Sequence, residues 1–107
     1  MKASFTTVHE VDEQRSRNGN LYREFLRVPA LSARLYVMPA GASDLQRPHR
    51  EDEMYYVIRG RARFRAAEED AAVSAASLLF VAAQVEHKLY DIAEKLAVLV
   101  FFAPAES

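Results

Sequence analysis

The sequence predicts an all-β fold, a small sandwich or barrel, with one domain over residues 1–107. Short apolar runs separated by turn residues recur along the chain, and none of them shows a long, clean helical period. Some runs alternate apolar and polar side chains, which is the period of a half-buried strand. A chain of 107 residues can bury roughly two thirds of the surface that its unfolded form exposes. It therefore needs no disulfide or other staple to fold.

The first strands are expected beside turn residues. Asn18-Gly19 is typical of a type I′ turn, so residues 21–28, rich in Tyr, Phe, Leu and Val, are expected to form the return strand of a hairpin. Residues 31–38 are expected to form the next strand, and residues 39–41, Pro-Ala-Gly, close it. The chain should therefore begin with antiparallel strands.

The middle of the chain predicts a second hairpin. In residues 61–65 three arginines share one face of an expected strand, and Ala62 and Phe64 share the other. The arginine face is expected to be solvated, with a substrate-binding role as the alternative. Residues 66–72 have high helix propensity, but an isolated helix of one or two turns is marginal in water. They are therefore expected to be a solvated hairpin connection.

Two stretches, residues 54–58 and 96–102, carry apolar side chains on both faces of the expected strands. A barrel strand with one solvent-exposed face does not need apolar side chains on both faces. Another element should therefore pack on the outer face. Because few helices are expected, a second copy of the chain is the predicted cover, in an isologous homodimer.

Composition excludes several classes of protein. The chain has no cysteine, which excludes disulfides, iron–sulfur clusters and thiolate sites and leaves His, Asp and Glu as metal ligands. Its formal net charge is −1 with both signs interspersed, so no nucleic-acid partner is expected. Residues 1–7 lack the apolar core of a signal peptide, and no apolar stretch is long enough to span a bilayer. A cytoplasmic protein without a membrane partner is expected.

Three residues carry a metal-binding pattern. His49 and Glu53 are four residues apart, just ahead of the apolar run 54–58, and His87 follows the apolar run 78–81. Two imidazoles and one carboxylate on neighbouring strands form a facial triad, which suits a divalent metal with open coordination positions. The third histidine, His9, has no partner at such a spacing and is expected on the surface.

The spacing resembles the two motifs of the cupin superfamily. The first, G-x5-H-x-H-x3-E-x6-G, is matched over residues 41–60. Its positions hold Gly41, Arg47, His49, Glu53 and Gly60, with arginine in the place of the first histidine. The second, G-x5-P-x-G-x2-H-x3-N, keeps its register over residues 76–91. Its positions hold Ala76, Ala82, Gln84, His87 and Asp91, of which only the histidine is retained.

The resemblance implies a small cupin-type β-barrel, a double-stranded β-helix or jelly roll, with a metal at one open end. It implies His49, Glu53 and His87 as ligands of one divalent transition metal, Fe, Mn, Ni, Cu or Zn. The alternative is a degenerate cupin whose histidines are hydrogen-bonded pocket residues without metal. Gly60 is expected in a turn after the strand that carries Glu53. The second-motif turn, residues 82–84, lacks its Pro and Gly and should be less rigid.

Arg47 cannot simply replace the missing ligand. A guanidinium about 5 Å from a divalent ion is repelled by roughly 6 to 7 kcal/mol at an effective dielectric near 20. We expect Arg47 to point to solvent or to pair with a nearby acid such as Asp44, Glu51 or Asp52. The alternative is that an anionic ligand bridges Arg47 and the metal, which would make it a clamp for a substrate carboxylate or phosphate.

Two more residues are candidates for substrate binding. Tyr55 lies two residues after Glu53, so its side chain should point to the same face and line the pocket, with core packing as the alternative. Tyr56 should point outward. Asp91 lies four residues after His87, so an extended strand would present both on one face, with Asp91 as a partner to the histidine or a pocket acid.

Three functions are compatible with these residues. The first is a metal-dependent oxygenase, a dioxygenase-type oxidoreductase acting on a small aromatic or dicarbonyl compound. The second is a module that binds a small molecule without turnover, which the drifted second motif and Arg47 favour. The third is a metal-independent isomerase or epimerase that uses His and Tyr as acid and base, as the resemblance to sugar-modifying cupins implies.

Overall fold

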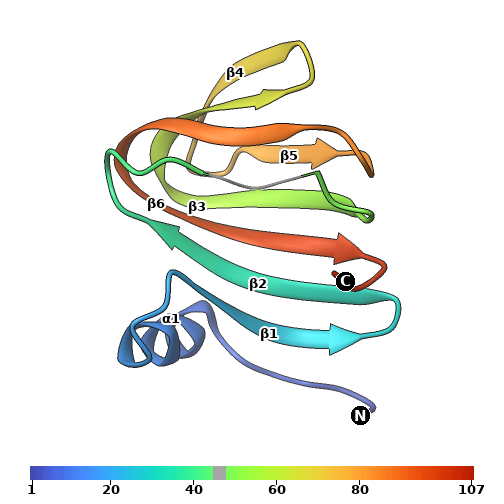
Figure 1. Ribbon diagram of the computed structural model, residues 1–107. Helices are drawn as coiled ribbons and strands as arrows, with labels where there is room; N and C mark the ends of the chain where they lie inside the picture. Colours follow the sequence, from blue (N-terminus) through green and yellow to red (C-terminus); the bar gives the residue numbers. More distant parts are fainter. Residues whose placement is uncertain (45–47) are drawn as a thin grey trace.

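The computed structural model describes residues 1–44 and 48–107. Within them one helix, α1 (Val8–Arg17), precedes six strands, whose bounds are β1 (Tyr22–Val28), β2 (Leu31–Met38), β3 (Asp52–Ala66), β4 (Glu69–Ser74), β5 (Leu78–Val81) and β6 (His87–Ala103). The strands pair antiparallel in one sheet of order β1-β2-β6-β3-β4, with β5 also paired to β3. Figure 1 shows this sheet curling on itself. The predicted all-β class is confirmed.

The two longest strands, β3 and β6, pair along their whole length, from Asp52 opposite Ala103 to Ala66 opposite His87. The register shifts three times between Val57 and Arg63, and such bulges bend a ladder. Gly60 lies at this bend with a φ of +99°, and a Cβ added to it would lie 2.4 Å from the Lys95 carbonyl oxygen. Gly60 therefore lies inside β3, and the expectation of a turn after the strand was wrong.

The concave side of the bent sheet holds the main core. Tyr55, Val57, Leu89, Val98 and Phe102 are among its buried members. The predicted alternation in residues 61–65 is confirmed, since Ala62 and Phe64 are buried and the three arginines are exposed. The hairpin that follows is also confirmed, but its turn is only Ala67 and Glu68, because residues 69–72 already pair in β4.

The expected hairpin at Asn18-Gly19 was wrong, because a helix precedes this dipeptide. Thr7 caps the N-terminus of α1 by accepting a hydrogen bond from the Glu10 amide at 3.0 Å. At the other end the Gly19 amide bonds the Ser16 carbonyl and the Asn20 amide bonds the Arg15 carbonyl, which is a Schellman motif. Gly19 supplies the positive φ of +70° that this motif needs. The turn residues therefore end a helix.

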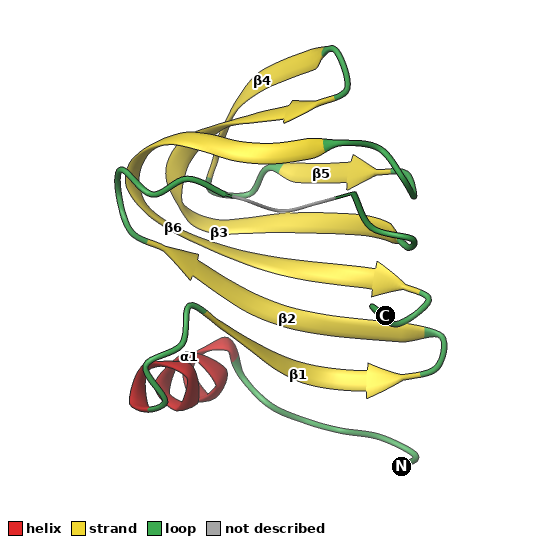
Figure 2. Cartoon of the chain, viewed as in Figure 1, coloured by secondary structure: helices red, strands yellow, loops and turns green. Residues whose placement is uncertain are grey.

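Helix α1 covers part of the outer face of the sheet, as Figure 2 shows. Val11 packs there with Leu35, Val37 and Ala97 in a second, smaller core cluster. This cluster explains part of the two-sided apolar pattern of β6 without a second subunit. No helix of the described residues is long and apolar enough to cross a bilayer.

Another part of the outer face stays apolar and exposed. Tyr56 points outward as predicted, with 38% of its surface exposed. Met54, Leu78 and Phe80 are exposed beside it on β3 and β5. The register pairs Met54 with Phe80 and Tyr56 with Leu78, so these four side chains form one outer apolar patch.

Candidate metal centre

The three predicted ligands come from separate parts of the fold. His49 lies in the segment before β3, Glu53 is the second residue of β3, and His87 is the first residue of β6. The residues between His49 and β3 are not in a strand, so the histidine reaches Glu53 from a bend and not from an extended β3. The bent sheet nevertheless brings all three side chains together, as their spacing in the sequence predicts.

The potential ligand atoms of His49, Glu53 and His87 all lie within 4.8 Å of one another. Glu53 Oε1 is central, 3.1 Å from His87 Nε2 and 3.5 Å from His49 Nε2. The Glu53 and His87 side chains are each 1% exposed, whereas the His49 side chain is 17% exposed. The cluster is therefore reached from the His49 side.

The tautomer of His87 is set by the backbone. His87 Nδ1 lies 2.9 Å from the Val85 carbonyl oxygen, which can only accept a hydrogen bond. The proton of a neutral His87 therefore sits on Nδ1, and Nε2 carries a lone pair. That lone pair faces Glu53 Oε1, which is also an acceptor. Two acceptors facing each other in a buried site need a cation or a proton between them.

Hydrogen bonding within the described residues leaves this pair unsatisfied. Glu53 Oε2 and His87 Nε2 are buried atoms without a hydrogen-bond partner there. Buried polar atoms are normally paired, so these two atoms need either a bound cation or a proton between them. A divalent metal fits, because it accepts lone pairs from two imidazole nitrogens and a carboxylate oxygen together.

Protonation is the alternative way to satisfy the pair. Burial works to lower the pKa of His87, but the contacts with the Glu53 carboxylate and the Val85 carbonyl outweigh it, and the pKa is raised above its ordinary value. Without metal, His87 therefore keeps a second ring proton up to a higher pH than a free imidazole does.

Tyr55 lies beside this pair, where the sequence predicts it. Its side chain is completely buried, and its ring centroid is 6.2 Å from that of His87. Burial, followed by the neighbouring Glu53 carboxylate, raises the pKa of Tyr55 well above its usual range. The phenol therefore keeps its proton at neutral pH and can act as a donor, not as a base. Its packing on Phe64, at 5.6 Å between ring centroids, shows that it is also part of the core.

Asp91 does not share a face with His87. It is exposed and has a positive φ of +47°, where the β6 register shifts against β3. It lines an outer hollow with Arg61, Arg63 and neighbouring residues of β4. The predicted common face fails because the bulge breaks the two-residue alternation of the strand. Arg47, expected in solvent or in an ion pair and with an anion clamp as the alternative, lies outside the described residues.

The second-motif turn, residues 82–84, is hydrogen-bonded to the segment that carries His49. Gln84 has a φ of +69°, and its amide donates to the His49 carbonyl at 2.7 Å. The Ala83 amide donates to Asp52 Oδ1 at 2.8 Å. These bonds tie the turn to the segment that carries His49, so it is anchored even without its proline and glycine.

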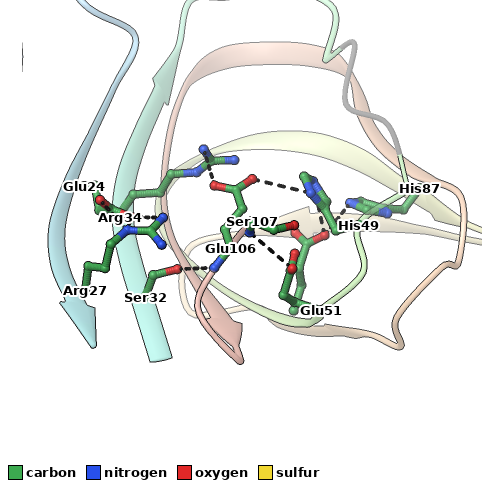
Figure 3. Close-up of polar contacts among 10 residues, drawn as sticks. Glu24, Arg27, Ser32, Arg34, His49, Glu51, His87, Glu106 and Ser107 are labelled. Carbon is green, nitrogen blue, oxygen red and sulfur yellow. Dashed lines mark hydrogen bonds and ion pairs between the residues drawn. The ribbon is translucent and has the colours of Figure 1, made fainter. Parts of the chain in front are cut away.

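Two site residues were not predicted from the sequence. Arg34 of β2 and Glu106, after β6, form an ion pair at 3.1 Å, and the other Glu106 oxygen is 3.4 Å from His49 Nδ1 (Figure 3). The Arg34 guanidinium also lies 5.0 Å from the centre of the Phe102 ring. Alternation along β2 places Arg34 on the same face as Met38, a core residue, which is a usable signal. Glu106 lies outside any strand, and no pattern marks it.

Comparisons with known proteins agree with the fold. Residues 34–102 match the family model of the cupin domain. An uncharacterized protein of Streptomyces coelicolor is 42% identical over 98 residues, which cover 92% of this chain and 93% of that protein. A crystal structure of an RmlC-like cupin from Shewanella frigidimarina matches with a TM-score of 0.71 at 20% identity, over 78% of this chain and 75% of that chain.

An enzyme is also among the similar structures. The DMSP lyase DddQ from Ruegeria pomeroyi matches with a TM-score of 0.66 at 21% identity, over 71% of this chain and 39% of that chain. At such identities the structural likeness shows the fold alone. The family model, however, covers more than half of the sequence. The chain belongs to the cupin superfamily.

Proposed function

We propose that this cupin binds one divalent transition metal through His49, Glu53 and His87. The observation that carries the proposal is the contact between His87 Nε2 and Glu53 Oε1 at 3.1 Å, in which a lone pair faces a buried carboxylate. The nitrogen and oxygen donor set suits Fe, Mn, Ni, Cu or Zn, and the supply of metal in the cell selects among them.

The proposed reaction is that of a metal-dependent dioxygenase-type oxidoreductase acting on a small aromatic or dicarbonyl compound. When bound, the metal would supply up to three open coordination positions, which suit a chelating substrate together with dioxygen. The chain's own residues would exclude water and orient the substrate. His49 packs at 5.1 Å against Phe102, and Tyr55 offers a protonated hydroxyl beside Glu53.

A metal-free small-molecule-binding module is the second candidate. It is favoured by the raised pKa of His87, because a proton on Nε2 satisfies the buried pair without a metal. Such a module would be stabilised by its ligand in the presence of a chelator, since a ligand that binds only the native state raises apparent stability.

Metal content and metal titration decide between the two. Elemental analysis of freshly purified protein should find a near-stoichiometric first-row metal, and chelator-treated protein should bind Zn²⁺, Mn²⁺ or Fe²⁺ in calorimetry. His49→Ala and His87→Ala should each lose this binding. His9→Ala is the matched control, because this histidine lies on α1 with an 81% exposed side chain and pairs with Glu13. Wild-type protein that is metal-free and fails to take up added ions would contradict the metal proposal.

We also propose that the protein is a homodimer joined through the outer apolar patch of Met54, Tyr56, Leu78 and Phe80. Leu78 and Phe80 are 65% and 63% exposed, and monomers rarely expose large contiguous apolar patches. Sedimentation at micromolar concentration should give a dimer mass for wild-type protein and a monomer mass for Phe80→Glu. Phe5→Glu is the control, since Phe5 is 93% exposed but lies outside the patch. A monomer mass for the wild-type protein would contradict the proposal.

A further inference from the structure

The residues that follow β6 are held beside His49 by hydrogen bonds from three successive backbone amides. The Ala105 amide donates to the Pro29 carbonyl at 3.2 Å, and the Glu106 amide donates to Ser32 Oγ at 2.9 Å. The Ser107 amide then donates to Glu51 Oε2 at 3.2 Å. Ser32 and Glu51 are buried, at 1% and 4% exposure, so their side chains are rigid acceptors. The segment therefore holds Glu106 in a defined place.

From this place Glu106 bridges two side chains. Its Oε1 lies 3.1 Å from Arg34 Nη1, and its Oε2 lies 3.4 Å from His49 Nδ1. Figure 3 shows Glu106 on one side of His49 and His87 on the other. The Arg34 and Glu106 side chains are only 12% and 20% exposed. Arg34 thus balances the carboxylate charge and fixes its orientation.

The bridge matters for the chemistry of His49. Its Nε2 lies 3.5 Å from Glu53 Oε1, so Nε2 is the nitrogen that faces the other two ligands. A neutral imidazole can present a lone pair at Nε2 only if Nδ1 carries the proton. A carboxylate acceptor at Nδ1 stabilises that tautomer and orients the ring toward the other two ligands.

We propose that Glu106 is a positioning residue for the metal centre, held by Arg34 and acting through His49. The inference rests on the proposed function, because it assigns a role within the same metal site. Glu106 touches no metal in this role. It determines how strongly His49 binds one.

Zinc affinity of the full chain, measured by calorimetry, gives the first test. Glu106→Ala should weaken Zn²⁺ binding about 10- to 100-fold, the usual effect of removing the outer partner of a histidine ligand. Glu106→Gln should regain part of the loss, because its amide oxygen can still accept the Nδ1 proton. The matched control is Glu94→Ala, which removes the carboxylate of an exposed pair with Arg61, also at 3.1 Å.

A spectroscopic readout separates positioning from general structural damage. In the Zn²⁺ form of the wild-type protein, nitrogen NMR should show the His49 proton on Nδ1, with a downfield, slowly exchanging resonance. Glu106→Ala should move or broaden that resonance, whereas the His87 ring signals should stay unchanged because their partner is Val85.

The outcomes separate the two proposals. Wild-type protein that binds no Zn²⁺ would overturn the proposed function and this inference with it. Wild-type binding with equal affinity and an unchanged His49 resonance in Glu106→Ala would overturn the positioning role alone. The same holds if Glu106→Ala gains affinity for acetate while Zn²⁺ binding is unaffected, because Glu106 would then serve only as a counter-ion to Arg34.

Discussion

His87 Nε2 lies 3.1 Å from Glu53 Oε1, although the two residues lie near opposite ends of the β3–β6 ladder. Glu53 pairs with Phe102 near one end of the β3–β6 ladder, and His87 pairs with Ala66 at the other end. A straight ladder would hold them far apart. The cluster of candidate ligands therefore depends on the bend in β3, which is located at Gly60.

Replacing Gly60 by alanine should destabilise the fold and the metal centre together. The new Cβ would lie 2.4 Å from the Lys95 carbonyl oxygen and 2.8 Å from Leu96 Cα, in a backbone with a φ of +99°. The steric and backbone terms together should lower the free energy of unfolding by about 3 kcal/mol. Urea denaturation with linear extrapolation measures the loss.

Gly41→Ala is the matched control for Gly60→Ala. Its φ of +81° is also positive, but a Cβ there meets nothing within 4 Å. Gly41→Ala should lower the free energy of unfolding only through the cost of its positive φ, by about 1 kcal/mol. Equal losses in the two variants would show that close contact with β6 at Gly60 is unimportant.

Glu53→Gln should separate metal binding from folding. The amide nitrogen can donate to the His87 lone pair, which removes the conflict between two buried acceptors. At pH 8 and without metal, the free energy of unfolding of this variant should lie within about 1 kcal/mol of the wild-type value or exceed it. Its metal affinity should fall by more than the roughly 100-fold that outer contacts contribute.

The comparison for this experiment is Glu53→Ala, measured by the same urea denaturation and calorimetry. It removes the acceptor and leaves His87 Nε2 buried without a donor, so metal-free stability should fall by about 1 to 3 kcal/mol. If Glu53→Gln destabilised the metal-free protein as strongly as Glu53→Ala, the lone-pair assignment at His87 would be wrong.

Metal-free protein should lose stability as the pH rises through the pKa of His87. The folded state raises this pKa above the unfolded value of about 6.5, so the folded protein binds more protons between the two values. The stabilisation is fully present below the unfolded pKa and disappears above the folded one. Denaturation in the presence of a chelator should show this slope, and His87→Gln should flatten it. If His87→Gln left the slope unchanged, the pH dependence of stability would come from another group.

The strands were predictable from the sequence because their alternation reports the buried face directly. The bounds of β2 agree with the predicted residues 31–38, and Ala62 and Phe64 point inward as predicted. Helix α1 was missed because it buries only Val11, so apolar periodicity is nearly absent. The Thr7 cap followed by Glu10 was its usable signal, and Asn18-Gly19 fits a helix end as well as a hairpin.

The proximity of the three candidate ligands could be predicted because the motif spacing determines it, whereas the contacts of their partners depend on tertiary structure. His49, Glu53 and His87 meet as their spacing predicts. The face on which Asp91 lies was predicted wrongly, because a spacing of four residues does not reveal a bulge in β6. Arg34 and Glu106 meet across 72 positions of sequence, through the fixed segment after β6. No local pattern encodes such a contact.

Restoring the two lost glycines of the second motif should stabilise the protein. Ala76 and Gln84 stand where the motif has glycine, and they adopt positive φ values of +72° and +69°. The left-handed conformation costs a residue with a Cβ roughly 1–2 kcal/mol, and the greater freedom of glycine in the unfolded chain offsets part of the relief. Ala76→Gly and Gln84→Gly should each raise the free energy of unfolding by about 1 kcal/mol in urea denaturation.

The control for the glycine variants is Ala75→Gly, which changes a neighbouring exposed residue outside the positive-φ set. It should lower stability by about 0.4–1 kcal/mol, because there glycine only adds unfolded-state freedom. Opposite signs at positions 75 and 76 would show that backbone strain, not general loosening, controls the effect. Destabilisation by Gln84→Gly would mean that the side chain of Gln84 contributes more than its backbone strain removes. The backbone bond from residue 84 to the His49 carbonyl is kept in this variant, so metal affinity should be unchanged.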